Sequence, residues 1–166
     1  MKKFLIIGSA NAITYKEIFP YIASGEWFIR SGNGKISFII RFINSDGEEQ
    51  NVPSLWYTNL DSRHLYKTLE LTKKYDERLY PKYDNYDAIE VSRIKDIPYD
   101  YDGCMGVPIS IVLFSPYQFE IIWTTDRGGD GMIEWLKKNP FDKSWDSAWI
   151  NGQKVYKRIL IKRVSK

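Results

Sequence analysis

A thiol and an imidazole are the first side chains of this sequence to consider for covalent chemistry. Cys104 is the only cysteine and His64 is the only histidine. A cysteine becomes a strong nucleophile when a histidine takes its proton and a third group orients that histidine. No sequence near either residue supplies a recognisable orienting partner or an oxyanion-binding loop. A buried thiol and a surface histidine are therefore the favoured interpretation. A single histidine also excludes most multi-histidine metal sites, so we predict no metal site.

Two short fragments contain residue types that can hold an exocyclic amine. Asp96-Ile97-Pro98-Tyr99 has an acid, one proline and an aromatic residue, and Asn139-Pro140-Phe141 has an amide, one proline and an aromatic residue. They imitate the Asn/Asp-Pro-Pro-aromatic turn of amino-methyltransferases, in which a side-chain oxygen and a backbone carbonyl accept hydrogen bonds from the amine. Neither fragment has both prolines, and proline is what stiffens the backbone of that turn. We therefore name no catalytic residue.

The end of the chain concentrates positive charge. The whole chain carries a net charge of only +3, but the segment KVYKRILIKRVSK contains no acidic residue. Its basic residues are Lys154, Lys157, Arg158, Lys162, Arg163 and Lys166. A local cluster of this kind is typical of a surface that contacts nucleic-acid phosphates. The alternative is a strand edge that lysines protect from pairing with another chain.

The elements that must position these residues begin at the first residues of the chain. Residues 4–8 form a short apolar run that ends in glycine, which predicts a strand covered on both faces, as in a parallel sheet. Thr14 and Glu17 have capping-box spacing, which predicts a helix that Pro20 kinks or shortens and Gly25 ends. A strand, a tight loop and a helix in this order are the pattern of a doubly wound sheet. The loop Ser9-Ala10-Asn11 is then a candidate site wall.

The rest of the chain reads as rich in β-structure. Residues 26–30 and 35–42 predict a hairpin around Gly32-Asn33-Gly34, and residues 52–58 predict a further strand. Residues 60–82 fit a helix and a strand equally well. Residues 88–92, 107–114 and 119–125 predict strands, and residues 132–138 predict a short helix. Residues 148–150 and 155–164 predict a hairpin around Asn151-Gly152. The expected fold class is therefore α/β to α+β.

Length and composition set broad limits. At 166 residues and 43% hydrophobic, the chain is long enough for one domain with a core, and no linker or repeat divides it. The first apolar run is too short for a signal peptide or a membrane span, so we expect no membrane partner. The lone cysteine fits a reducing compartment, and we expect a cytoplasmic protein.

Several long segments resemble one known family. These are FLIIGSANAITYKEIFPYI, WYTNLD, YPKYDNYDAIEVSRIKDIPYDYDGCMGVPIS, QFEII and INGQKVYKRILIK. In this order they are similar to the carboxyl-terminal half of EcoRI-like adenine-specific DNA methyltransferases, and the resemblance spans nearly the whole chain. In that family the S-adenosylmethionine loop and the Asn-Pro-Pro-Phe turn precede the block that corresponds to FLIIG. The resemblance therefore implies that the first strand is a late strand of a Rossmann-like methyltransferase sheet.

The resemblance also implies which residues meet the substrate. An enzyme that methylates a base extrudes it from the duplex into a pocket and stacks it on flat side chains. On this analogy Asn11, Trp56 and Tyr57 line the target-adenine pocket, although core packing is the alternative for either aromatic residue. The expected DNA contacts come from the basic end and from a tyrosine-rich run, for which a β-rich core is the alternative. These residues are Tyr80, Tyr83, Tyr86, Tyr99, Tyr101, Lys157, Arg158, Lys162 and Arg163.

Three functional readings follow. The first is the carboxyl-terminal portion of a site-specific DNA N6-adenine methyltransferase of a restriction-modification system, inactive alone. Residues 1–60 then supply late strands of the methyltransferase sheet and residues 61–166 a DNA-contacting, target-recognition-like portion of the same partial domain. The expected partners are double-stranded DNA and either the missing amino-terminal half or a second copy. S-adenosylmethionine is the cofactor of the complete enzyme, and we expect none for this chain alone. The second is a non-catalytic DNA- or protein-binding module, and the third a free-standing enzyme that uses residues 96–99.

Overall fold

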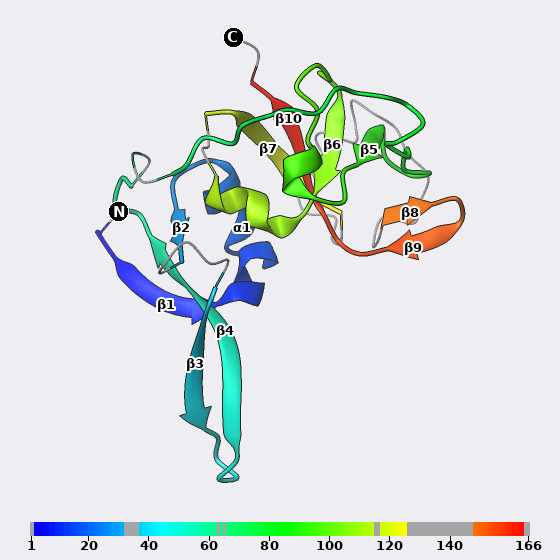
Figure 1. Ribbon diagram of the computed structural model, residues 1–166. Helices are drawn as coiled ribbons and strands as arrows, with labels where there is room; N and C mark the ends of the chain where they lie inside the picture. Colours follow the sequence, from blue (N-terminus) through cyan, green and yellow to red (C-terminus); the bar gives the residue numbers. More distant parts are fainter. Residues whose placement is uncertain are drawn as a thin grey trace. The chain divides into compact units, whose positions relative to one another are not determined.

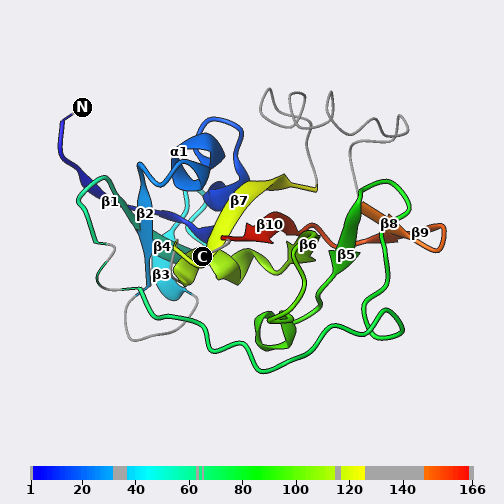
Figure 2. The same ribbon diagram turned by 90° about the horizontal axis from the view of Figure 1, so that it is seen from above.

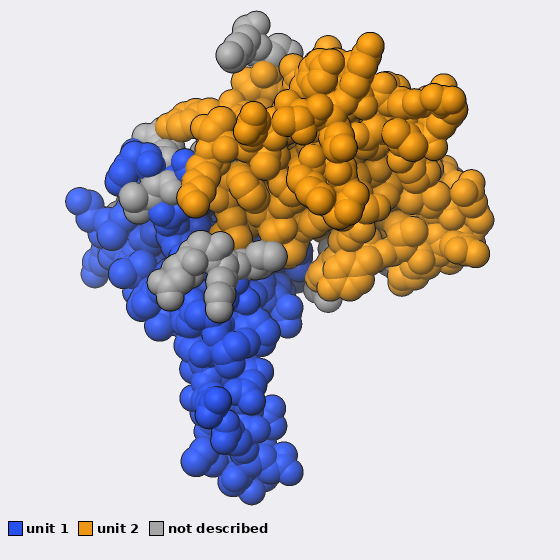
Figure 3. Space-filling model, in the orientation of Figure 1, with its two compact units in different colours: residues 1–66 blue, residues 67–166 orange. Residues whose placement is uncertain are grey.

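The computed structural model describes residues 2–31, 37–62, 64, 66–114, 117–125 and 148–164 (Figure 1). The chain divides into two compact units, residues 1–66 and residues 67–166, which Figure 3 shows in different colours. The subdivision predicted from the sequence lies at residue 60. The described residues contain both helices and strands, with more residues in strands than in helices. The α/β to α+β class is confirmed at this level.

The first unit contains a sheet built around one long strand. Its strands are β1 (Leu5–Ser9), β2 (Phe28–Arg30), β3 (Phe38–Ile43) and β4 (Glu49–Thr58). β4 pairs antiparallel with β1 along one edge and with β2 and then β3 along the other. β2 and β3 therefore run in the same direction, one after the other along the same edge of β4. Figure 1 shows β3 and the start of β4 extending from the rest of this unit as a two-stranded arm.

The predicted hairpin between residues 26–30 and 35–42 is wrong. β2 and β3 both pair with β4 and do not pair with each other. The turn residues on which that prediction rested, 32–34, lie outside the described residues. The observed hairpin joins β3 to β4 through residues 44–48, where the Asn44 side-chain oxygen accepts hydrogen bonds from the amides of Asp46 and Glu48 at 3.0 and 2.8 Å. Gly47 has φ 82° there, a conformation that glycine adopts without strain.

The strand predicted at residues 4–8 is confirmed as β1, but its surroundings differ from the expectation. Within the described residues it pairs only with β4, in the antiparallel direction. Leu5, Ile6 and Ile7 are 56%, 50% and 45% exposed, so apolar side chains on both faces of β1 are about half exposed. β1 and β2 are nevertheless parallel to each other, because both run antiparallel to β4.

The helix expected after β1 is shorter than predicted. A 3-10 helix, η1 (Ala10–Thr14), follows β1 directly, and α1 (Phe19–Ala23) begins with Pro20 in its first turn. Pro20 therefore starts the helix and does not interrupt it, because the first turn lacks amide partners in any case. The capping box does not form, since Ile18 is the N-cap of α1. Gly25 has φ 75° just beyond the helix, as its C-terminal position predicts.

The second unit contains a four-stranded sheet. Its strands are β5 (Ala88–Glu90), β6 (Cys104–Val107), β7 (Phe119–Thr124) and β10 (Ile159–Arg163), in the order β5-β6-β10-β7 (Figure 2). β5 and β6 are parallel, and the other two pairs are antiparallel. β10 is thus an internal strand, and Ile159, Leu160 and Ile161 are completely buried. The interpretation of the basic end as a protected strand edge is therefore wrong.

Two predictions for the second unit need correction. Residues 107–114 do not form a strand: β6 ends at Val107 and the 3-10 helix η5 (Ile109–Leu113) follows Pro108. Proline has a fixed φ and no amide to donate to a sheet, which explains the break. A second 3-10 helix, η4 (Ile94–Asp96), lies between β5 and β6. In the described part of residues 60–82, His64 is in a 3-10 turn, and the other residues form no helix or extended strand and make only isolated bridges.

The hairpin predicted around Asn151-Gly152 is confirmed. β8 (Ala148–Ile150) pairs antiparallel with β9 (Gln153–Val155), and Asn151 and Gly152 have φ 51° and 72°. The positive φ values at both positions are those of the tight hairpin turn that Asn-Gly favours. The second strand is shorter than predicted, because residues 159–163 belong to β10. The helix predicted at residues 132–138 lies outside the described residues.

Candidate functional site

Tyr57 fixes the end of β1 and the loop that follows it. Its side chain is only 2% exposed, and its hydroxyl donates a hydrogen bond to the Ser9 carbonyl at 2.7 Å. A Cβ on Gly8 would lie 3.0 Å from the ring, so glycine makes room for Tyr57 at this position. Burial, and secondarily the nearby Tyr15, raises the pKa of Tyr57 to about 12. The phenol therefore remains a donor at any physiological pH.

Asn11 lies in the loop that Tyr57 supports. It is an exposed residue of η1, and its amide donates to the Ser9 hydroxyl oxygen at 3.2 Å. The Thr14 hydroxyl donates to the Asn11 carbonyl at 3.4 Å. These bonds fix the backbone around Asn11 and leave its exposed side chain at the carboxyl end of β1.

Trp56 lies on the opposite face of β4 from Tyr57. Neighbouring residues of a strand point to opposite faces, so these two rings cannot line the same side of the sheet. Trp56 is half-buried, stands between Ile7 and Arg30 in the strand register, and its ring is 6.1 Å from that of Phe38. The structure thus brings Tyr57 and the Asn11 loop together and separates Trp56 from them.

The tyrosine-rich run belongs largely to the core of the second unit. Tyr80, Tyr83 and Tyr86 are 6%, 6% and 4% exposed. Their hydroxyls donate to the Asp96 carbonyl, the Glu90 carboxylate and the Thr125 carbonyl respectively. Their buried rings have no face available for stacking on DNA, so the expected direct contact through Tyr83 and Tyr86 has to be corrected.

Tyr101 and Tyr99 are more accessible than the other tyrosines of the run. Tyr101 is half-buried, with its ring 4.6 Å from that of Tyr75, and burial followed by the neighbouring Tyr75 raises its pKa. Tyr99 is 46% exposed. Of the tyrosines predicted to meet DNA, these two retain accessible surface.

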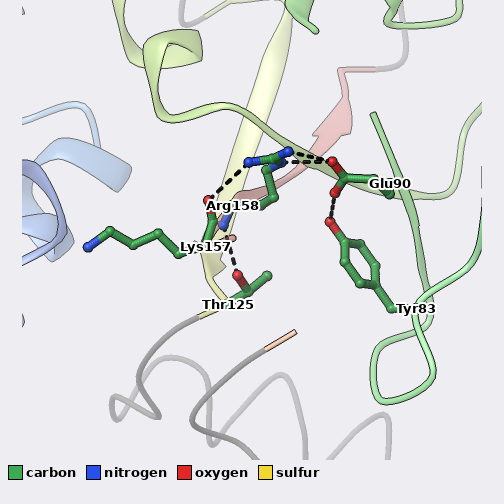
Figure 4. Close-up of polar contacts among 5 residues, drawn as sticks. All are labelled: Tyr83, Glu90, Thr125, Lys157 and Arg158. Atoms are coloured by element: carbon green, nitrogen blue, oxygen red, sulfur yellow. Dashed lines mark hydrogen bonds and ion pairs between the residues drawn. The ribbon is translucent and has the colours of Figure 1, made fainter. Parts of the chain in front are cut away.

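Arg158 forms a buried ion pair with Glu90 (Figure 4). The shortest distance between the guanidinium and the carboxylate is 2.7 Å, and the two side chains are 17% and 7% exposed. Tyr83 donates to the other carboxylate oxygen, and burial together with the Glu90 charge raises the Tyr83 pKa. The Arg158 amide also donates to the Thr125 hydroxyl oxygen at 2.8 Å. This arginine is therefore engaged inside the protein, in contrast to the predicted DNA contact.

Sequence reasoning missed Glu90 as the centre of this network. The signal was present, because Glu90 is the single acidic residue in the apolar strand Ala-Ile-Glu-Val at residues 88–91. A buried carboxylate needs a cationic partner or several hydrogen-bond donors. Arg158 is 68 residues away in the sequence, so the pair could not be identified without the fold.

The remaining predicted basic residues differ in accessibility. Lys162 is exposed and stands opposite Glu120 in the register of β10 with β7. Arg163 is half-buried, and one of its terminal nitrogens is buried with no hydrogen-bond partner among the described residues. Lys157 is half-buried, and its side chain extends away from the Glu90–Arg158 pair in Figure 4. Lys162 is the most accessible of the predicted basic contacts.

The fragment at residues 96–99 is not arranged to hold an amine. The Asp96 carboxylate accepts a hydrogen bond from the Arg93 guanidinium at 2.6 Å, and its carbonyl accepts one from Tyr80 at 2.7 Å. Ile97 is completely buried where the catalytic turn would have its first proline. The second fragment, at residues 139–141, lies outside the described residues.

Neither the thiol nor a metal cluster offers another site in the described chain. Cys104 is 3% exposed, and burial raises its pKa to about 12, so the unreactive protonated form dominates at neutral pH. No group of three or more histidine, cysteine, aspartate or glutamate residues that could hold a metal ion occurs among the residues described. In the same part of the chain, no helix has the length and apolar character needed to cross a membrane.

Comparison with known proteins identifies similar sequences. A family model described as adenine-specific methyltransferase EcoRI matches residues 1–164. The Type II methyltransferase M.EcoRI of Escherichia coli is 43% identical over 178 residues, which cover 97% of this chain and 50% of that protein. The Type II methyltransferase M.MgeORF184P of Mycoplasma genitalium is 33% identical over 98% of this chain and 57% of its own length. The chain thus spans about half the length of these relatives. No solved structure matches it.

Proposed function

Because the chain belongs to the EcoRI family of adenine-specific methyltransferases, we propose that it is the carboxyl-terminal portion of a site-specific DNA N6-adenine methyltransferase. It contributes one wall of the target-adenine pocket and part of the DNA-contacting surface. The complete enzyme acts on double-stranded DNA in the cytoplasm, as one component of a restriction-modification system. The chain alone is inactive in this proposal.

The observation that carries the proposal is the strand arrangement of the first unit. The parallel strands β1 and β2 are connected through η1 and α1, and the antiparallel strand β4 lies between them. A strand, helix and parallel strand in succession form the unit from which Rossmann-like sheets are built. The apolar residues exposed on both faces of β1 support its role as an inner strand of a larger sheet.

The pocket wall is proposed at the carboxyl end of β1. In open α/β sheets, ligands bind outside the carboxyl ends of the parallel strands. Asn11 lies there with an exposed side chain, which can hydrogen-bond to the edge of an extruded base. Tyr57 holds this loop through the Ser9 carbonyl and acts as a positioning residue. Trp56 is half-buried on the other face of β4, so Asn11 is the leading candidate.

S-adenosylmethionine is proposed to bind mainly to the rest of the complete enzyme. The residues at the carboxyl end of β1, Ser9, Ala10 and Asn11, include no carboxylate of the kind that holds ribose hydroxyls in Rossmann-like sites. The sequence also contains no Pro-Pro pair with which to form the amine-holding turn. The described residues therefore do not fit the cofactor by themselves, and we assign them no step that depends on it.

Reconstitution tests the proposal. The chain would be coexpressed with the segment of M.EcoRI that it does not match, and the mixture assayed for transfer of a labelled methyl group from S-adenosylmethionine to adenine in DNA. We expect activity in the mixture and none in either part. Calorimetry should detect no cofactor binding to the chain alone. Micromolar binding by the isolated chain, or methyl transfer by it, would overturn the proposal.

A non-catalytic DNA- or protein-binding module is the second candidate. The observation that favours it is the exposed apolar surface of β3, where Ile39, Phe42 and Ile43 are 57%, 48% and 73% exposed. Exposed apolar groups gathered on one element often mark an interaction surface. A chain that binds DNA or protein but never restores activity to the missing segment would support this reading.

A further inference from the structure

The β8–β9 hairpin is held firmly on the second unit by Asp84 and Asn85. The Asp84 carboxylate accepts hydrogen bonds from both turn amides, those of Asn151 and Gly152, at 3.0 and 2.7 Å. The Asp84 amide donates to the Trp149 carbonyl at 2.8 Å, and the Trp149 amide donates to the Asn85 side-chain oxygen at 3.1 Å. These bonds fix the position of the hairpin, and Asp84 itself is an exposed residue.

The hairpin presents polar and cationic side chains to solvent. Asn151, Gln153 and Lys154 are exposed, and Tyr156, directly after β9, is 73% exposed. In contrast, Ala148 is 1% exposed and anchors the base of the hairpin. Residues 148–164 contain no acidic residue, so the hairpin itself adds no negative charge to that of the Asp84 carboxylate that binds its turn amides.

We infer that the β8–β9 hairpin enters the major groove of DNA. Lys154 then lies against a phosphate, and the side-chain amides of Asn151 and Gln153 face base edges. The major groove admits a two-stranded ribbon, and asparagine and glutamine amides match the donor and acceptor pattern of adenine there. Lysine contacts to phosphates fix the register of the protein on the duplex. The inference rests on the proposed function, since it names the element through which the methyltransferase portion reads its DNA.

The β3–β4 hairpin, the second exposed hairpin among the described residues, is less suited to this role. The turn between β3 and β4 carries Asp46 and Glu48, and β4 begins with Glu49, whereas Arg41 is the one basic residue of β3. Arg41 also forms an ion pair with Glu49 at 3.4 Å. An acidic tip is repelled by phosphates, so charge favours the β8–β9 hairpin as the groove-entering element.

A single-cysteine crosslink tests the inference. Cys104 is buried and its thiol is protonated, so Gln153→Cys introduces the one reactive surface thiol of the chain. The matched control is Lys95→Cys, which changes an exposed residue of η4 in the same unit. Each protein would be mixed with a duplex that carries a disulfide-activated tether on a cytosine amine in the major groove. We expect several-fold more crosslinked product from the residue 153 variant than from the control.

The outcomes separate this inference from the proposed function. If the chain binds duplex DNA but both variants crosslink equally, or react only with a minor-groove tether, the hairpin assignment is overturned and the methyltransferase proposal stands. If the chain binds no duplex DNA, the proposed DNA contact falls as well. In a second measurement, Lys154→Ala should lower the salt slope of binding by about one, whereas Gln153→Ala should leave that slope unchanged. Equal slopes for Lys154→Ala and the unchanged chain would count against the phosphate contact.

Discussion

At the scale of single residues, the contact between Gly8 and Tyr57 determines where the Asn11 loop lies. A Cβ at residue 8 would be 3.0 Å from the Tyr57 ring, closer than ordinary packing allows. We predict that Gly8→Ala lowers the free energy of unfolding by about 1–3 kcal/mol, the usual cost of overpacking. In urea unfolding, Gly8→Ala combined with Tyr57→Leu should cost less than the sum of the two single changes. Strict additivity would show that the ring is not the cause.

Tyr57 should also give the protein a pH dependence in alkali. Its pKa rises from 10 in the unfolded chain to about 12 in the folded protein, chiefly through burial. Between these values the unfolded state releases the proton and the folded state keeps it, so stability falls as pH rises. The contribution is fully present below pH 10. Tyr57→Phe should make the decline between pH 10 and 12 shallower in unfolding measurements. An unchanged decline would assign it to other groups, such as Tyr83.

We predict that the ion pair of Glu90 with Arg158 stabilises the second unit because each buried charge compensates the other. Removing one partner leaves a buried charge, which costs about 3–5 kcal/mol, whereas apolar replacement of both can be nearly neutral. Arg158→Met should therefore destabilise the chain strongly, and Arg158→Met with Glu90→Leu should recover much of the loss. Thermal unfolding of the two variants gives the comparison. A double variant as unstable as Arg158→Met would contradict this view of the pair.

At the scale of elements, local chemistry was predictable and long-range pairing was not. The Asn151-Gly152 turn was found because its positive φ values depend on two adjacent residues. The partner of β2 was assigned wrongly because it is β4, some thirty residues away, and nothing between Arg30 and Phe38 reveals this. The apolar run at residues 107–114 matched a strand pattern, but apolar runs do not separate strands from other buried segments. Pro108 was the sequence feature that indicated the end of the strand at Val107.

The exposed β1 strand should make the isolated chain self-associate. Leu5, Ile6 and Ile7 lie on a strand that, in the described structure, has one paired edge. Exposed apolar edge strands pair with other chains, and a charged side chain on such an edge suppresses this. We predict that Ile6→Lys shifts the light-scattering mass toward the monomer, while the exposed substitution Lys95→Ala in η4 does not. A wild-type chain that stays monomeric at high concentration would contradict the prediction.

At the scale of the whole molecule, the sequence could not separate the accessible residues among the predicted contacts from the buried ones. Asn11 and Lys162 are exposed, as a residue that contacts DNA must be. Tyr83 and Arg158 were predicted as contacts from residue type as well, but both bind Glu90 inside the second unit. The type of a residue determines which groups its side chain can bind. Its neighbours in the fold decide whether DNA or the protein itself is the partner.

This difference between exposed and buried cations yields a prediction for DNA binding by the full chain. Each phosphate contact releases counterions and contributes roughly 0.9 to the salt slope of binding. We predict that Lys157→Ala with Lys162→Ala lowers this slope by the contribution of about two phosphate contacts. Arg158→Ala, in contrast, should lower the thermal stability, because Glu90 loses its partner.

Trp56→Ala should leave the non-specific affinity for DNA unaltered, since a base pocket matters only when a base is extruded. Fluorescence anisotropy across a salt series measures all three variants. If the double lysine variant keeps the parental slope, the basic end is not a phosphate-contacting surface and the DNA contacts must come from other elements.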